Sequence, residues 1–314
     1  MESLPNLPIL EFTNDTLESI RKIHNLHEPG RMDEAIDVLS EWAKKQEHFL
    51  RKEFPRDYLE RLIISAKGSL EKAKMRLDGL CTLKTLAPKH FHTGDMSDIK
   101  KTLDGFRFFV LPKFAPDYYR VYLVKGYAKH ITPNDFQAFY QFSIRKSEYW
   151  MKHDYFNGFI LAFDFTHKDL NILDFITNNN PSEMHQHITS CIKVYGARLK
   201  AIHIITTSRL ADAVLIFLKP FFGAKLANRF YVHKKMDDLF EHLPKDIFPV
   251  DYGGKEKSIV ELHDKWFSVI NSEEHIEYMK EVVKTGTDES RRLIDKMNTE
   301  YLGIPGSFRT LRID

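Results

Sequence analysis

Two short apolar runs constrain the fold of this chain more than any other feature of its sequence. Residues 158–165 have the sequence GFILAFDF, and residues 199–205 have the sequence LKAIHII. Continuous apolar runs of this length are typical of strands buried on both faces of a sheet, because a strand with one wet face alternates apolar and polar residues. Helices must cover both faces of such strands, so the two runs predict an α/β protein.

Strand and helix signals alternate on either side of these runs. Thr132 and Pro133 supply a hydroxyl at the N-cap and a proline at the first helical position, so we predict a helix from there to about residue 153. Further helices are expected from Asn180-Pro181 and over Ala211–Lys225. This alternation predicts a mixed, mostly parallel sheet flanked by helices. Weaker strand patterns occur at Phe106–Leu111, Val121–Tyr127 and Arg229–Val232.

The spacing of the apolar residues divides the chain into three parts. Residues 1–88 show helical spacing alone, as in the stripe that contains Ile36 and Leu39, and predict an N-terminal helical bundle. Residues 89–255 carry the alternation of strands and helices, and residues 256–314 return to helical spacing. We therefore expect an N-terminal helical domain, a central α/β domain and a C-terminal helical tail.

Net charge, cysteine content and the lengths of the apolar runs limit which partners and which cellular compartment we expect. The formal net charge is +2, so no whole-chain field draws the protein to nucleic acid, and we expect no nucleic-acid partner. The two cysteines, Cys81 and Cys191, would form one disulfide or remain reduced thiols, and we favour the thiols. Because the chain shows neither an apolar leader nor a run of about 18 apolar residues, we predict a cytoplasmic protein.

Motifs for catalysis and cofactor binding are absent from the sequence. It contains no glycine-rich phosphate-binding loop and no GxSxG nucleophile elbow, so we predict no catalytic residue and no cofactor. The pairs His90/His92 and His185/His187 would suit a metal or a solvated surface, and we favour the surface. Asp164 follows a buried strand, where it is either a catalytic acid or a carboxylate satisfied by its neighbours, and we favour the second.

The segment Ala211–Phe222 is too apolar for an ordinary surface helix, since only Asp212 and Lys219 are charged. It is either a buried core helix or a helix that meets a membrane, and periodicity alone does not separate the two. Pro220 should kink it near its end. Its basic flanks favour an anionic membrane, where each cation near the surface contributes about 1 kcal/mol. The flanking cations are Arg198, Lys200, Arg209, Lys219, Lys225, Arg229, Lys234 and Lys235.

One face of the predicted helix after Thr132 carries aromatic and hydroxyl side chains. Phe136, Tyr140, Ser143 and Ser147 follow one another at helical spacing. An apolar pocket can hold the polar group of a lipid with such a face. Alternatively, the serines bond to carbonyl groups of the preceding turn.

Several short motifs occur in a familiar order. The most specific is Lys219-Pro220-Phe221 followed by Lys225 and Arg229. The others are Leu62–Ala73, Gly158–Asp164, Leu199–Ile205, and Leu243-Pro244 with the later Asp251–Gly254. Together they resemble the CRAL-TRIO (Sec14-like) lipid-transfer family, especially its tocopherol- and retinaldehyde-binding branch, over roughly residues 30–255.

This resemblance implies a hydrophobic lipid pocket under a mobile helix, with serines that hold the polar end of the ligand and basic residues that contact phosphoinositides. Ser143 and Ser147 fall at the positions of those serines. The expected ligand-binding residues are Tyr140, Ser143, Ser147, Phe163, Tyr195, Leu199, Ile202, Val214, Leu215, Leu218, Phe221 and Phe222. The expected phosphoinositide- or membrane-binding residues are Lys67, Arg198, Lys200, Lys219, Lys225 and Arg229.

The predicted function is that of an intracellular, non-enzymatic carrier. It would bind tocopherol, a retinoid or a similar isoprenoid and transfer it between membranes. A basic patch would attach it reversibly to phosphoinositides or other anionic lipids. Two alternatives remain open: a phosphoinositide-responsive regulatory or scaffold module without lipid transfer, and an enzyme that modifies a lipid through Asp164 or a histidine.

Overall fold

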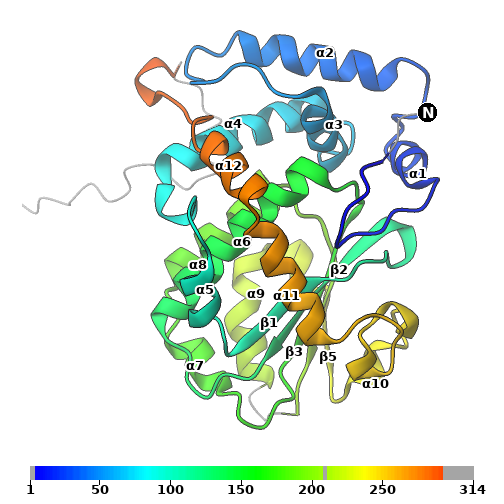
Figure 1. Cartoon of the computed structure of the whole chain (residues 1–314), viewed down its shortest axis with the longest axis vertical. Helices are drawn as coiled ribbons and strands as arrows, with labels where there is room; N and C mark the ends of the chain where they lie inside the picture. The colour runs from blue at the N-terminus through cyan, green and yellow to red at the C-terminus, as the bar shows by residue number, and fades with distance from the viewer. Residues whose placement is uncertain (1–3, 208–210, 293–314) are drawn as a thin grey trace, which may run out of the picture.

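The computed structural model describes residues 4–207 and 211–292. An N-terminal layer of helices lies over one end of a five-stranded sheet, and further helices cover the faces of the sheet (Figure 1). The fold is therefore α/β with an N-terminal helical part, which confirms the predicted class. The N-terminal helices are α1 (Thr16–Ile23), α2 (Arg31–Lys44), α3 (Arg56–Ser65) and α4 (Leu70–Leu86).

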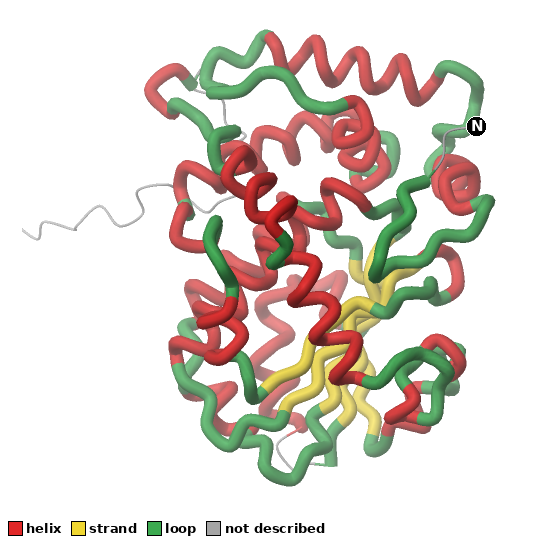
Figure 2. The backbone as a smooth tube through the Cα atoms, viewed as in Figure 1, coloured by secondary structure: helices red, strands yellow, loops and turns green. Residues whose placement is uncertain are grey.

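The strands form a single sheet (Figure 2), which is mixed and mostly parallel. Its order is β1-β2-β3-β4-β5, with β1 antiparallel to β2 and every later pair parallel. Each predicted strand matches an observed one to within two residues at either end. The strands are β1 (Phe106–Val110), β2 (Tyr119–Gly126), β3 (Gly158–Asp164), β4 (Leu199–Ile205) and β5 (Phe230–His233).

Helices on opposite sides of the sheet exclude water from its central strands. In Figure 1, α6, α7, α8 and α9 lie on one side and α10 on the other, where α10 packs against β4 and β5. As predicted, Thr132 caps α6, and its backbone and hydroxyl both donate to the Asp135 carboxylate. The helices are α5 (Ser97–Thr102), α6 (Pro133–His153), α7 (Ile172–Thr177), α8 (Pro181–Thr189), α9 (Ala211–Ala227) and α10 (Met236–Leu239).

A register shift between β3 and β4 changes which residues face α6. Phe159 pairs with Leu199, but Leu161 pairs with Ile202 because the shift falls between Phe159 and Ile160. Simple alternation along a strand would place residues 199 and 202 on opposite faces. The irregularity instead turns both Leu199 and Ile202 toward the same side of the sheet.

The helix that begins at Pro181 does not continue regularly to Tyr195. Residues 190–194 form one π-helical turn, which inserts an extra residue and rotates the side chains that follow. Tyr195 consequently leaves the face shared by Met184, Ile188 and Cys191. It packs in the N-terminal helical core, and its hydroxyl donates to Glu148 Oε1 at 2.7 Å.

The C-terminal helices pack closely on the rest of the protein. These are α11 (Ile259–Ile270) and α12 (Glu273–Val282). Trp266 of α11 is buried in the same core as the sheet, and its Nε1 donates to Val110 O at 2.9 Å. Met279 of α12 joins the N-terminal helical core instead. The proposed boundaries near residues 88 and 255 thus fall between segments that share cores, and the last part of the tail, 293–314, lies outside the described residues.

Candidate functional site

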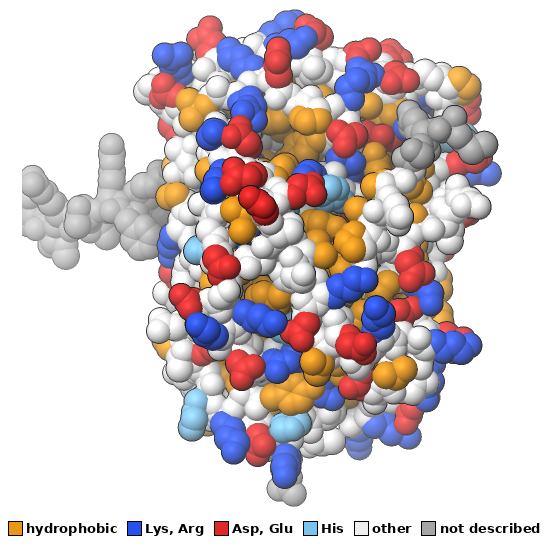
Figure 3. Space-filling view, in the orientation of Figure 1, with side chains coloured by type: hydrophobic (Ala, Val, Ile, Leu, Met, Phe, Trp, Pro, Cys, Tyr) orange, Lys and Arg blue, Asp and Glu red, His pale blue; other side chains and the backbone are white. Residues whose placement is uncertain are grey.

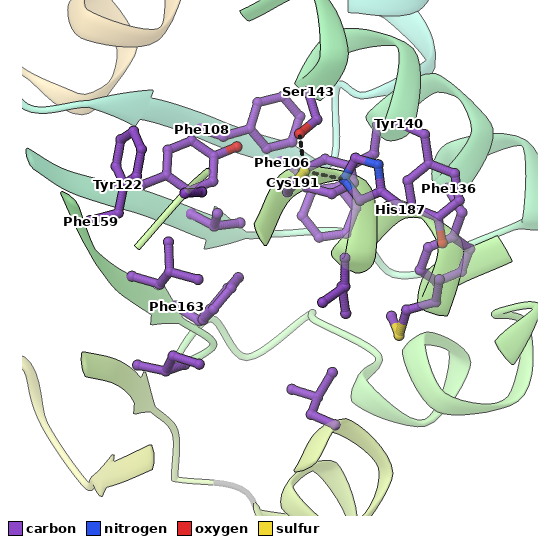
Figure 4. Close-up of a pocket in the computed structure, with 18 of the residues that line it drawn as sticks. Phe106, Phe108, Tyr122, Phe136, Tyr140, Ser143, Phe159, Phe163, His187 and Cys191 are labelled. Atoms are coloured by element: carbon purple, nitrogen blue, oxygen red, sulfur yellow. Dashed lines mark hydrogen bonds between the residues drawn. The ribbon is translucent and has the colours of Figure 1, made fainter. Parts of the chain in front are cut away.

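An apolar cavity of about 200 Å³ lies between the sheet and α6 (Figure 4). Its floor is a row of side chains that crosses four strands in register: Tyr122, Leu161, Ile202 and Phe230. Phe159 and Leu199 form a second, shorter row. The β3–β4 register shift is therefore what allows both rows to face the cavity.

One face of α6 forms the wall opposite the sheet. Its lining residues recur at intervals of three and four, as the helical period of 3.6 requires. The π turn after α8 contributes Cys191, and α9 closes another side with Leu218 and Phe222. The lining residues of α6 are Asp135, Phe136, Phe139, Tyr140, Ser143, Lys146, Ser147 and Trp150.

The structure brings eight of the twelve predicted ligand-binding residues to this cavity. Tyr195 is directed elsewhere by the π turn. Val214, Leu215 and Phe221 of α9 pack in an adjoining apolar cluster with α7 and α8 instead of lining the cavity, because α9 turns only part of its inner face toward it. The eight lining residues are Tyr140, Ser143, Ser147, Phe163, Leu199, Ile202, Leu218 and Phe222.

The two predicted serines differ in their hydrogen bonds. Ser147 Oγ donates to Ser143 O at 2.8 Å, which is the bond to the preceding turn that the sequence left open. Ser143 Oγ lies 4.0 Å from Cys191 Sγ, a distance typical only of a weak sulfur contact. Ser143 is thus the serine whose hydroxyl has the weaker partner within the cavity wall.

The expected surface position is wrong for His90 and His187, which the packing of α6 and α8 buries. His187 instead forms a neutral pair with Cys191 beside Ser143. His187 Nε2 lies 3.6 Å from Cys191 Sγ, and the imidazole stacks on Tyr140 with centroids 4.4 Å apart. Burial, with the charges of His90 and Lys146, lowers the pKa of His187 to about 3, and burial raises the pKa of the Cys191 thiol to about 11. Both groups are therefore uncharged near neutral pH.

Lys146 is the least expected residue of the cavity wall. Its side chain is fully buried, and its Nζ has no hydrogen-bond partner among the described residues. Tyr122 Oη and Trp150 Nε1 are also buried without a partner in that part of the chain. The helical spacing from Ser143 to Lys146 and Trp150 was a signal that could have placed this lysine on the aromatic face.

Four of the predicted basic residues come from three parts of the fold: Lys67 follows α3, Arg198 precedes β4, and Lys225 and Arg229 lie at and after the end of α9. Partial burial and the charges of Arg198, Lys225, Lys72 and Arg229, in that order, lower the pKa of Lys67. Contacts agree with this proximity: Arg198 bonds to His24, whose carbonyl lies against Gly68, and Arg229 bonds to the Leu199 carbonyl. We call Lys67, Lys72, Arg198, Lys225 and Arg229 the basic cluster; Lys72 was not predicted.

Members of the basic cluster differ in how they are held. Arg198 Nη2 lies 3.0 Å from His24 Nε2, and Arg229 donates to the Leu199 carbonyl, so these two arginines are anchored to the protein. Lys67 and Lys225 are exposed, and the described residues provide neither with an ion-pair partner. The two lysines are therefore the members best able to reach an external anion.

The remaining predicted basic residues lie outside the basic cluster. Lys200 pairs with Asp117 at 3.0 Å, which neutralises it locally. Lys219 is exposed on the outer side of α9. Arg209, another of the flanking cations, lies outside the described residues.

Asp164 is satisfied by its neighbours. It accepts hydrogen bonds from Thr166 Oγ1 at 2.6 Å and Tyr252 Oη at 2.6 Å, and it pairs with Lys125 at 3.1 Å. Although burial acts in the opposite direction, these hydrogen bonds and the Lys125 charge hold its pKa below the usual value. This geometry matches the structural interpretation of Asp164 and keeps the carboxylate ionised.

Residues 107–254, which contain the sheet and the cavity, match the model of the CRAL/TRIO domain. This segment is a CRAL/TRIO domain. The CRAL/TRIO family consists of lipid-binding and lipid-transfer proteins, which are generally not enzymes. None of the helices formed by the described residues has the length and apolarity that a membrane crossing requires.

Individual relatives are similar over a shorter stretch. The chain is 38% identical over 61 residues to proteins named alpha-tocopherol transfer protein-like from Mus musculus and Homo sapiens. This match covers 19% of the chain and only 18% of each relative. The crystal structure of Sfh5 aligns with 87% of this chain and 98% of its own, at 12% identity and a TM-score of 0.47.

Proposed function

We propose that this protein holds a small hydrophobic lipid in the cavity and transfers it between membranes. The single observation that carries the proposal is the apolar cavity enclosed between the sheet, α6 and α9. Burying an apolar surface there is favourable by about 25 cal/mol for each Å² removed from water. A lipid exchanging between bilayers needs such an enclosed apolar environment.

The ligand class that fits best is an isoprenoid such as tocopherol or a retinoid. The lining is mostly aromatic and aliphatic, and flat rings such as Phe106, Phe108, Phe136 and Phe163 suit a rigid or conjugated ligand (Figure 4). The local similarity to proteins named alpha-tocopherol transfer protein-like agrees with this class.

In this proposal α9 is the helix that opens. Its inner side places Leu218 and Phe222 against the cavity, while Ile216 is 75% exposed on its outer side. Pro220 and the non-helical backbone of Gly223, with φ of 70°, interrupt its hydrogen bonding near the C-terminal end. An apolar helix with an interrupted end can leave the sheet when a bilayer replaces its contacts.

The basic cluster is the proposed membrane contact. Lys67 and Lys225 would bind the phosphates of a phosphoinositide or another anionic lipid, beside the C-terminal end of α9. Concentrated positive charge accelerates encounter with an anionic surface and is screened by salt. The ligand would therefore be released where the cluster docks.

Lipid extraction and uptake test the carrier. Wild-type protein should yield a co-purified lipid on solvent extraction and should take up α-tocopherol or retinol. Leu218→Gln, which puts an amide into the cavity wall, should weaken uptake at least tenfold. Ile216→Gln, on the same helix but facing outward, should leave affinity unchanged and slow transfer from vesicles. Recovery of no lipid together with no uptake of either probe would sink the proposal.

A separate comparison tests the basic cluster. Lys67→Glu with Lys225→Glu should reduce binding to vesicles containing phosphoinositide at low salt, and lipid uptake should persist. Lys129→Glu with Lys257→Glu makes the same charge change at exposed sites outside the basic cluster. Equal loss in both double variants would assign the effect to net charge alone.

The basic cluster also favours a second candidate function, a phosphoinositide-responsive scaffold. A scaffold needs the anionic contact but no exchange of cavity lipid. Phosphoinositide-dependent vesicle binding without transfer of tocopherol or retinol between vesicles would support the scaffold in place of the carrier.

A further inference from the structure

Lys146 stands in the cavity wall without an anion. Its side chain is fully buried, and none of the described carboxylates forms an ion pair with it. The Cys191 thiol, which acts on it, supplies no anion because burial keeps the thiol protonated. Burial lowers the pKa of the Lys146 amine well below its usual value, because an ammonium buried without an anion is costly. An anion beside it in the cavity would favour the charged form.

Aromatic rings orient the Lys146 amine instead. Nζ lies 3.4 Å from the centroid of the Tyr122 ring, 5.0 Å from that of Phe142 and 5.1 Å from that of Trp150. Rings in this arrangement attract a cation through their faces and supply no negative charge. They position the amine at the cavity and leave its three N–H groups to be satisfied by something else.

Two more unpaired polar groups surround the same place. Tyr122 Oη and Trp150 Nε1 are buried, line the cavity and have no partner among the described residues. Figure 4 shows Tyr122 directed into the same space as Ser143 and Cys191. An indole N–H and an ammonium can only donate, so their common partner must be an acceptor.

The acceptor that matches this set is a carboxylate. It carries one negative charge, which one lysine balances, and its two oxygens accept several hydrogen bonds without donating any. An alcohol has one oxygen and no charge, and a phosphomonoester would leave negative charge unbalanced in an apolar cavity. Building on the proposed function, we infer that the lipid held in the cavity is an apolar carboxylic acid whose carboxylate pairs with Lys146.

Matched lipid pairs test the head group separately from the chain. Binding of all-trans-retinoic acid and retinol, and of palmitic acid and 1-hexadecanol, would be measured by competition and by quenching of tryptophan fluorescence, to which Trp150 in the cavity wall contributes. Wild-type protein should prefer the acid at least tenfold in both pairs. Lys146→Met, of similar length without charge, should lose that preference while binding the alcohols as well as before. Lys152→Met makes the same change on α6 at a partly exposed lysine paired with Glu274 and should keep the preference.

Each outcome has one meaning. Equal binding of acid and alcohol by wild type, or an acid preference that survives Lys146→Met, overturns the carboxylate inference and leaves the carrier intact. Failure of wild type to bind any of the four probes, with no co-purified lipid, overturns the carrier itself. Melting curves check that the variant is folded. Because Lys146→Met removes an amine that is buried without a hydrogen-bond partner, the empty variant should melt no lower than wild type.

Discussion

At the residue scale, two buried basic residues differ in whether the described residues provide them with an anionic partner. Arg120 and Asp154 form an ion pair at 3.0 Å with both side chains fully buried, and Arg120 also donates to Pro112 O. This pair is complete, and it ties β2 to the end of α6. Lys146 is equally buried but has no ion-pair partner among the described residues. We therefore assign only the Arg120–Asp154 pair to the scaffold.

Removing one member of the Arg120–Asp154 pair should destabilise the fold strongly. Asp154→Asn would leave the Arg120 guanidinium buried beside a neutral amide, and we expect unfolding free energy to fall by about 3–5 kcal/mol. Glu277→Gln breaks an exposed pair with Lys280 and should change it by less than about 1 kcal/mol. Urea denaturation of the two variants measures both. Comparable losses would contradict the assignment of Arg120–Asp154 as scaffold.

At the element scale, two irregular elements decide what reaches the cavity. The β3–β4 register shift brings Leu199 and Ile202 to one face, and the π turn after α8 keeps Cys191 at the cavity while turning Tyr195 away. Periodicity predicts regular helices and strands. Periodicity is least informative where one extra residue turns all the following side chains toward another face of the element.

The packing of α11 against the sheet core can be tested by substituting Trp266. Trp266→Ala should lower the free energy of unfolding by about 3–5 kcal/mol because it empties part of the sheet core and leaves Val110 O without its donor. Trp266→Phe keeps most of the volume and should cost about 1–2 kcal/mol for the lost hydrogen bond. Thermal and urea unfolding would measure both. An α11 that forms an independent tail would show neither effect on the main transition.

At the scale of the whole molecule, charge is dispersed on the surface and histidine is concentrated inside. Figure 3 shows acidic and basic side chains interspersed over one face, as a net charge of +2 would suggest. Burial is the main cause that lowers the pKa of six histidines to about 3 or 4. They are His24, His153, His187, His203, His263 and His275.

These histidines predict acid sensitivity with a defined sign. Their folded-state pKa values lie below the unfolded value of about 6.5, so between pH 6.5 and about 4 the unfolded chain binds more protons. Stability should be constant above pH 6.5 with respect to these groups and fall as pH drops toward 4. Each group contributes at most about 1.4 kcal/mol per pH unit.

Melting temperatures between pH 7.5 and 4.5 would measure this loss. His263→Asn offers a matched comparison, because the amide oxygen can still accept from the Phe108 N–H while the titrating ring is gone. The variant should show a shallower fall with pH than wild type. Parallel curves would mean that His263 does not titrate on unfolding in this range.

The sequence by itself determined the class of fold, the strands and the cap of α6, because these depend on local composition and on the periodicity of apolar residues. It also identified one helix face, since Tyr140, Ser143 and Ser147 need only the helical period to fall together. Tertiary structure decided what local periodicity could not. The π turn excluded Tyr195, packing against α7 and α8 drew Val214 and Phe221 away, and the fold brought β2 beneath α6. Only that last contact places Tyr122 against Lys146. Local periodicity could not predict this, because the charge state and partners of a buried amine depend on groups far away in the chain.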